Sequence, residues 1–255
     1  METGIISKSL AAVRREPSET SEMVNQLLFG ETFDIVENYK DWYRVIGHFD
    51  GYHGWLDSRL TEKISDISLL EKRSITSRIF NANEINSESV MLHLCPGSIL
   101  YNLEGSIFSN AFKKYSYTDN PFISLPNNTS EAVTALAKSF LNSPYLWGGR
   151  SPFGIDCSGL VQVVYRITGI DLPRDASQQA LTGSTVEFID HIKPGDLAFF
   201  DNEEGAITHV GIIGANNTII HSSGFVRIDK FDHQGIFNIL TNKYSHKLRV
   251  IKRVF

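Results

Sequence analysis

Residues 147–167 read WGGRSPFGIDCSGLVQVVYRI, a turn-rich segment followed directly by an apolar one. Apolar residues recur at helical spacing as far as Ile167, and Asp156 is suited to be the N-cap of that helix. The pattern predicts a helix that begins at Cys157. A helix N-terminus stabilises an anion, so this position favours a thiolate with a lowered pKa. Burial as a small apolar side chain is the other common fate of a free cysteine.

Composition limits the classes of partner. The chain has 255 residues, of which 42% are hydrophobic, as in ordinary globular proteins of two or three small domains. A net charge of −5 provides no basic surface of the kind that nucleic-acid binding needs. No run approaches the roughly 20 apolar residues of a transmembrane helix. We therefore expect a ligand held in a site, with no nucleic acid partner and no membrane segment.

The N-terminus and the cysteines bear on location. The first residues lack the basic segment and apolar core of a signal peptide. This predicts a cytoplasmic protein, or a secreted or periplasmic one if a leader has been removed. The two cysteines, Cys95 and Cys157, do not imply a disulfide framework. We expect a monomer.

Three domains are predicted along the chain. Residues 1–62 contain short β-type runs split by turns, which indicates a small barrel. Residues 63–125 repeat this texture more faintly, so we expect a divergent second barrel. Residues 126–255 begin with a helical pattern at 131–140, capped by Ser130, and continue through the cysteine helix to strand-like runs. Helices followed by an antiparallel sheet indicate an α+β domain, the organisation of papain-like peptidase cores.

A cysteine nucleophile needs a base that is itself oriented by a third group. His209 and His221 stand on two adjacent strand-like runs, whereas the remaining histidines, His246 included, lie in the barrels or in polar, loop-like surroundings. A two-residue connection would put His209 and His221 on opposite faces of the sheet, and a three-residue connection at 215–217 puts them on one face. The catalytic interpretation therefore predicts an odd loop or a bulge.

Two other interpretations of these residues stay open. Each histidine could be a polar residue on a half-buried strand. Cys157, His209 and His221 could also hold zinc around an open position, although the chain has no paired Cys-x-x-Cys or His-x-x-x-His spacing. We expect no metal and no cofactor.

From residue 130 to 255 the chain resembles the NlpC/p-sixty cysteine peptidases, whose motifs it matches in order and spacing. The matching segments are YLWGG at 145–149, DCSGLV at 156–161, LPRDASQQ at 172–179, KPGDLAFF at 193–200, THVGI at 208–212 and IH at 220–221. The resemblance implies that Cys157 is the nucleophile, His209 the base and His221 the residue that orients the base. It also implies that Tyr145 lies at the oxyanion site.

Residues 14–18, 26–31 and 50–56 resemble a bacterial SH3-like (SH3b) domain. Two such barrels before this catalytic domain resemble one branch of the family, the γ-D-glutamyl-L-diamino acid endopeptidases. That resemblance implies cleavage of the bond from γ-D-Glu to diaminopimelate or lysine in peptidoglycan stem peptides with a free N-terminal L-Ala, such as a murein tripeptide, during recycling. The branch's substrate-binding positions match Asp156, Ser158, Ser177, Glu16 and Tyr52.

Each of these positions has a simpler alternative, and so does the function. Asp156 also fits a pure N-cap, and Glu16 and Tyr52 fit solvated loop residues. The enzyme could be a secreted wall hydrolase that acts on intact peptidoglycan. A non-catalytic wall-fragment binding protein is a further alternative, although a binder has no need for Cys157, His209 and His221 together.

Overall fold

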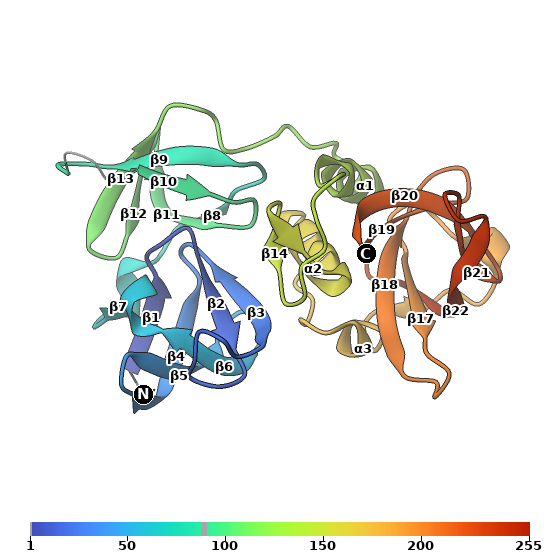
Figure 1. Cartoon of the computed structure of the whole chain (residues 1–255). Coiled ribbons are helices and arrows are strands. Elements are labelled where there is room, and N and C mark those ends of the chain that lie inside the picture. The colour runs from blue at the N-terminus through green and yellow to red at the C-terminus, as the bar shows by residue number, and fades with distance from the viewer. Residues whose placement is uncertain (1, 88–90) are drawn as a thin grey trace. The chain divides into compact units, whose positions relative to one another are not determined.

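The computed structural model describes residues 2–87 and 91–255 (Figure 1). The chain divides into two compact units. The first holds the chain up to Ile123 together with Trp147–Ser151, and the second holds Ser124–Leu146 and Pro152–Phe255. Residues 88–90 of the predicted second barrel lie outside the described residues. Within the described part, no helix has the length and apolar character needed to cross a bilayer.

The first barrel is an antiparallel sheet with the strand order β3-β2-β6-β5-β4-β1-β7. Its elements are β1 (Glu2–Ile6), β2 (Leu10–Arg14), β3 (Met23–Leu28), β4 (Thr32–Tyr39), β5 (Trp42–Gly47), β6 (His53–Asp57), the 3-10 helix η1 (Ser58–Leu60) and β7 (Thr61–Ile64). The predicted runs correspond to β2, β4, β5 and β6. The sequence did not reveal β3, because Asn25 and Gln26 interrupt its apolar pattern, or the long-range pair β1 and β7.

The second barrel has the strand order β10-β9-β13-β12-β11-β8. Its elements are η2 (Ile67–Leu69), β8 (Arg73–Ile75), β9 (Phe80–Glu84), β10 (Met91–Leu94), β11 (Ile99–Glu104), β12 (Ile107–Asn110) and β13 (Lys113–Tyr117). Phe29 of the first barrel packs edge-on against Phe108 and Tyr115, at centroid distances of 6.0 and 5.5 Å. The hydroxyl of Tyr101 donates to the carbonyl of Gly30 at 2.9 Å. The two barrels therefore share a core and pack as one unit.

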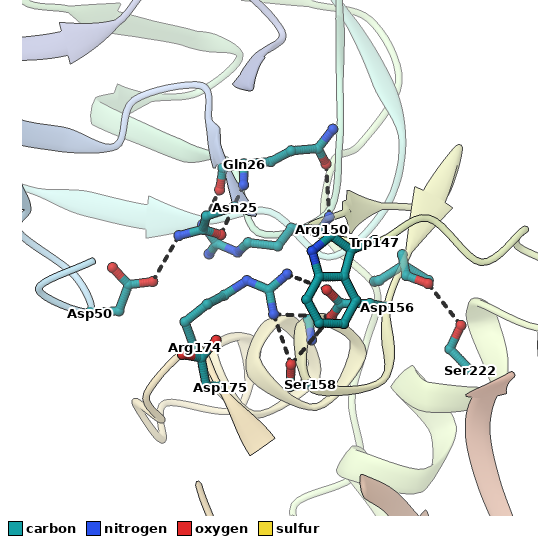
Figure 2. Close-up of polar contacts among 12 residues, drawn as sticks. Asn25, Gln26, Asp50, Trp147, Arg150, Asp156, Ser158, Arg174, Asp175 and Ser222 are labelled. Atoms are coloured by element: carbon teal, nitrogen blue, oxygen red, sulfur yellow. Dashed lines mark hydrogen bonds and ion pairs between the residues drawn. The ribbon is translucent and has the colours of Figure 1, made fainter. Parts of the chain in front are cut away.

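A buried ion pair holds Trp147–Ser151 on the first barrel. Arg150 donates from Nη1 and Nη2 to the two carboxylate oxygens of Glu31, at 2.8 and 3.0 Å. Its backbone N–H donates to Gln26 Oε1 at 2.8 Å (Figure 2), and β14 (Arg150–Ser151) packs against β3. Gly148 is required here because its φ is +77° and a Cβ atom would lie 2.6 Å from the carbonyl oxygen of Met23.

The second unit is an α+β fold, as predicted. It contains α1 (Thr129–Ser139), β15 (Gly154–Ile155), α2 (Cys157–Ile167), α3 (Ala176–Gln179), β16 (Ser184–Thr185), η3 (Ile189–His191), β17 (Leu197–Asp201), β18 (Ile207–Ile213), β19 (Thr218–Ser223), β20 (Phe225–Asp232), β21 (Gly235–Asn238) and β22 (Lys243–Arg253). The sheet order is β16-β22-β17-β18-β19-β20-β21, and β22 also pairs with β21. The antiparallel sheet thus closes into a small barrel, against which α2 packs through β18 and β19 (Figure 1).

The helix ends agree with the predictions except at one cap. Helix α2 begins at Cys157 and is followed by Gly169 with a φ of +86°, as a helix end commonly is. Helix α1 starts earlier than predicted, because Asn128 and not Ser130 is its N-cap. Asn128 Oδ1 accepts hydrogen bonds from two N–H groups of the first turn, while the hydroxyl of Ser130 donates to the carbonyl of Pro194. Asparagine is as good an N-cap as serine, so sequence alone could not choose between them.

Replacing Glu31 with Gln should lower the free energy of unfolding by about 3–5 kcal/mol, because Arg150 would keep a buried charge without a counter-ion. Urea denaturation of the full chain measures this loss. The matched control is Glu37→Gln, whose exposed pair with Arg44 spans 3.4 Å and should contribute about 0–1 kcal/mol. Equal losses in the two variants would contradict the role given to the buried pair.

Candidate active site

Cys157 is the first residue of α2, and Asp156 is the N-cap of this helix. Asp156 Oδ1 accepts a hydrogen bond from the N–H of Gly159 at 2.7 Å, which satisfies one of the donors that a helix start leaves without a partner. Because α2 packs directly on β18 and β19, the thiol and the strands that carry His209 and His221 come from elements in contact.

A buried arginine also holds the carboxylate of Asp156 (Figure 2). Arg174 Nη1 donates to Asp156 Oδ1 at 3.0 Å and Nη2 donates to Oδ2 at 2.5 Å. Nη1 also donates to the hydroxyl of Ser158 at 2.8 Å. Sequence reasoning did not single out Arg174. The position of Arg174 in the matching motif at 172–179 was the available signal, but the burial of Asp156, which makes a cation necessary, is visible only in the structure.

The two candidate histidines share one face of the sheet, as the register argument requires. Strands β18 and β19 pair with Ile212 opposite Ile220, so the connection consists of residues 215–217. Asn216 and Asn217 have φ values of 55° and 53°, a left-handed conformation that asparagine tolerates. The odd loop expected from the catalytic interpretation is confirmed.

A chain of hydrogen bonds crosses three neighbouring strands. His209 Nε2 and His221 Nδ1 are 2.9 Å apart, and His221 Nε2 lies 3.1 Å from Asp229 Oδ2. Arg227 Nε donates to the same oxygen at 2.8 Å. Sequence reasoning missed Asp229 and Arg227 because it did not predict β20. Gly224, which follows His221 closely and has a φ of +75°, is the turn signal that could have revealed this strand.

The thiol of Cys157 is protonated in the resting protein, contrary to the sequence prediction. Burial raises its pKa to about 12, and the charge of Asp156 adds to that rise. The backbone N–H groups of Val210 and Ser158 act in the opposite direction and lower the pKa, but they do not overcome the rise. The prediction considered the helix N-terminus alone, whereas desolvation disfavours the thiolate more strongly.

The imidazole of His209 is neutral at neutral pH. Burial lowers its pKa well below the ordinary value, and the neighbouring His246, His221 and Arg227 act in the same direction. A neutral imidazole is the form that can accept a proton from the Cys157 thiol. The resting site therefore pairs an uncharged acid with an uncharged base.

His246 does not lie in the loop-like surroundings expected from sequence. It lies on β22, and its ring stacks on that of His209 with a centroid distance of 4.1 Å and an interplanar angle of 24°. The pairing of β17 with β22 shifts register after Phe199, so that Phe200 faces Leu248. This bulge turns His246 onto the face of the sheet that carries His209. An irregularity of this kind has no clear sequence signature.

The remaining predicted residues fall in both units. Burial raises the pKa of Tyr145 to about 12, and the nearby Cys157 and Asp156 act in the same direction. Ser177 is exposed on α3. Glu16, which is exposed, and Tyr52, which is partly buried, belong to the first barrel.

The geometry does not favour the zinc interpretation. Among residues 2–87 and 91–255, no group of three or more His, Cys, Asp or Glu side chains is arranged to hold a metal ion. His209 and His221 direct ring nitrogens at each other, at 2.9 Å, and not at a common point where an ion would sit.

Comparisons with known proteins place this site in a family. The NlpC/P60 family model matches residues 142–245, and the model of the bacterial dipeptidyl-peptidase SH3 domain matches residues 13–59. The gamma-D-glutamyl-L-lysine dipeptidyl-peptidase of Bacillus subtilis is 33% identical over 213 residues, which cover 77% of this chain and 71% of that protein. The chain belongs to the NlpC/P60 family. It is a cysteine peptidase with an N-terminal SH3-like domain.

Two further similarities extend over almost the whole length of this chain. Dipeptidyl-peptidase 6 of Lysinibacillus sphaericus is 27% identical over 258 residues, covering 90% of this chain and 92% of that protein. The crystal structure of an NlpC/P60 family protein from Bacillus cereus has a TM-score of 0.84, covers 98% of this chain and 99% of its own, and is 20% identical. This structural similarity supports the fold.

The reaction of Cys157 with iodoacetamide should become about tenfold faster per pH unit between pH 8 and pH 10, because the thiol is still protonated there and only the thiolate reacts. Mass spectrometry can follow alkylation at Cys157 separately from Cys95. A rate that stays level from pH 6 to pH 10 would show a thiolate already formed at neutral pH and would contradict the raised pKa.

Replacing Gly211 with Ala should lower kcat by about tenfold, because small displacements of catalytic groups are costly. A Cβ atom at this position would lie 2.7 Å from Ile219 Cδ1 and 3.0 Å from His221 Cβ, which would push His221 away from His209. Steady-state kinetics measures the loss. No loss of kcat in G211A, measured on a protein that unfolds at the same urea concentration as the wild type, would contradict the argument.

Proposed function

We propose that this enzyme hydrolyses the bond between γ-D-Glu and the diamino acid, diaminopimelate or lysine, of peptidoglycan stem peptides whose N-terminal L-Ala is free. The products are L-Ala-γ-D-Glu and the remainder of the peptide, and the reaction serves murein peptide recycling. The observation that carries the proposal is a similarity that spans both the SH3-like and the peptidase domains of relatives named gamma-D-glutamyl-L-lysine dipeptidyl-peptidase.

The geometry supports a covalent mechanism. Cys157 passes its thiol proton to the neutral His209 as its sulfur attacks the γ-carbonyl carbon of the substrate. Nδ1 of His209 receives this proton, because Nε2 is engaged by His221. The protonated His209 then gives the proton to the leaving amine, which leaves a thioester on Cys157. Water activated by His209 hydrolyses the thioester and restores the thiol.

Tyr145 fits the role of oxyanion donor. Its hydroxyl is protonated at neutral pH, since burial and the nearby charges raise its pKa to about 12. A protonated phenol near Cys157 can donate a hydrogen bond to the tetrahedral oxyanion. The first N–H groups of α2, which lack intrahelical acceptors, are further candidate donors to the same developing charge.

Recognition of the substrate amine needs carboxylate charge beyond that of Asp156. The bidentate pair with Arg174 already compensates Asp156, so a bound ammonium gains less from it than from a lone carboxylate. Glu16 is the additional carboxylate in the proposal. Ser158, Ser177 and Tyr52 contribute hydroxyl groups that can bind the peptide near its N-terminus.

The free enzyme should cleave L-Ala-γ-D-Glu-L-Lys or its diaminopimelate counterpart, and it should cleave the N-acetylated forms at least about 100-fold more slowly. The physical reason is that acetylation removes the ammonium and leaves its carboxylate partners unpaired, which costs about 2–5 kcal/mol. Liquid chromatography with mass spectrometry detects the dipeptide product, and Cys157→Ala serves as the inactive control.

Other outcomes of the same assay decide between the alternatives. Equal rates on free and acetylated peptides, together with release of peptides from intact sacculi, would favour a hydrolase of the assembled wall. Binding of the tripeptide without any product would favour a wall-fragment binding protein. Either result would overturn the proposed specificity.

A further inference from the structure

Asp229 lies at the far end of the hydrogen-bond chain that leads to the reactive thiol. Strands β19 and β20 pair with His221 opposite Arg227 and Ile219 opposite Asp229. Paired residues share a face of the sheet, and so do residues two positions apart. His221, Arg227 and Asp229 therefore face the same way, and Asp229 stands diagonally across from His221.

The carboxylate of Asp229 is buried and ionised. Its exposed fraction is 3%. Burial by itself would raise its pKa, but the hydrogen bonds from His221 and Arg227 and the charge of Arg227 outweigh that effect and hold the pKa below its ordinary value. An ionised carboxylate has only acceptors, so the proton in the contact between His221 Nε2 and Asp229 Oδ2 belongs to the imidazole.

This single fact determines where the protons lie on both rings. His221 is neutral at neutral pH, because burial lowers its pKa below the ordinary value. With its proton on Nε2, its Nδ1 carries a lone pair. The contact of 2.9 Å between His221 Nδ1 and His209 Nε2 must then use a proton on His209 Nε2. A neutral His209 with its proton on Nε2 has a free lone pair on Nδ1. Nδ1 is the nitrogen that accepts the thiol proton in the proposed mechanism.

We propose that Asp229, held by Arg227, is a positioning residue that sets the tautomers of His221 and His209 and thereby keeps Nδ1 of His209 free to accept the Cys157 proton. The role of Asp229 in turnover rests on the proposed function. The positions of the protons on His221 and His209 do not depend on it. Asp229 touches neither the substrate nor the reacting atoms and acts through His221.

The surrounding charges agree with this role. Arg227 fixes the carboxylate from its own strand, through a hydrogen bond of 2.8 Å. His246 on β22 stacks on His209 and is itself neutral at neutral pH, since burial lowers its pKa to about 4. Asp229 is thus the anion that faces His221, and no second carboxylate is hydrogen-bonded to either ring among the described contacts.

Nitrogen-15 NMR of the resting wild-type enzyme tests the proton arrangement without any substitution. Ring nitrogens with and without a proton differ strongly in chemical shift. We expect His209 and His221 each to carry a proton on Nε2 and none on Nδ1 at pH 7. A proton on Nδ1 of His209 would overturn the proposal.

The variant Asp229→Asn tests the consequence for the reaction. An amide can donate or accept toward His221, so the tautomers should become mixed, kcat should fall by about 100-fold and KM should change less than about threefold. The control is Asp232→Asn on the same strand. The carboxylate of Asp232 accepts a hydrogen bond from the hydroxyl of Tyr244, and its replacement should leave kcat and both tautomers unchanged.

These readouts separate the inference from the proposed function. If Asp229→Asn loses activity while both tautomers stay as in the wild type, the role of Asp229 is merely structural and the proposal fails. If the tautomers shift in D229N but no stem peptide is cleaved even by the wild type, the proposed substrate fails and the role of Asp229 stands. Should D229N not fold, the wild-type spectrum still decides.

Discussion

The register between β18 and β19 is the constraint on which the rest of the site depends. Side chains alternate between the two faces of a strand, so a slip of one residue would move His221 to the opposite face. The loop at 215–217 prevents that slip because its two asparagines adopt left-handed conformations that close an odd connection. Gly211 lies opposite His221 and has no side chain, which leaves room for the two imidazoles to meet.

The parts of the site that could be predicted from the sequence are those with local sequence signals. The start of α2 at Cys157 follows from one capping residue and a helical apolar pattern, and both are local. The shared face of His209 and His221 follows from the parity of a short loop. The α+β class follows from the order of elements along the chain. None of these features depends on which distant segments come together.

The parts that escaped prediction depend on tertiary contacts or on burial. Arg174 and Asp229 acquire their partners only through packing between separate elements. His246 reaches His209 through a bulge in β22, which reverses the facing that simple alternation would assign. The prediction of a lowered pKa for the Cys157 thiol was wrong for a related reason. The helix N-terminus can be read from sequence, but the degree of burial cannot. The predicted N-cap of α1 was wrong because two residues suited to capping, Asn128 and Ser130, lie within three positions.

The charges of the peptidase unit form compensated pairs around an uncharged centre. Asp156 with Arg174 lies beside the nucleophile, and Asp229 with Arg227 lies beyond the second imidazole. Between them, the Cys157 thiol and the His209 imidazole are neutral at rest. Proton transfer then creates the uncompensated charges, a thiolate at the start of α2 and an imidazolium linked through His221 to a carboxylate. Fixed dipoles and charges that already face these positions stabilise the transition state without reorganising. The burial that suppresses the resting thiolate therefore also strengthens the electrostatic interactions that stabilise the thiolate once it forms.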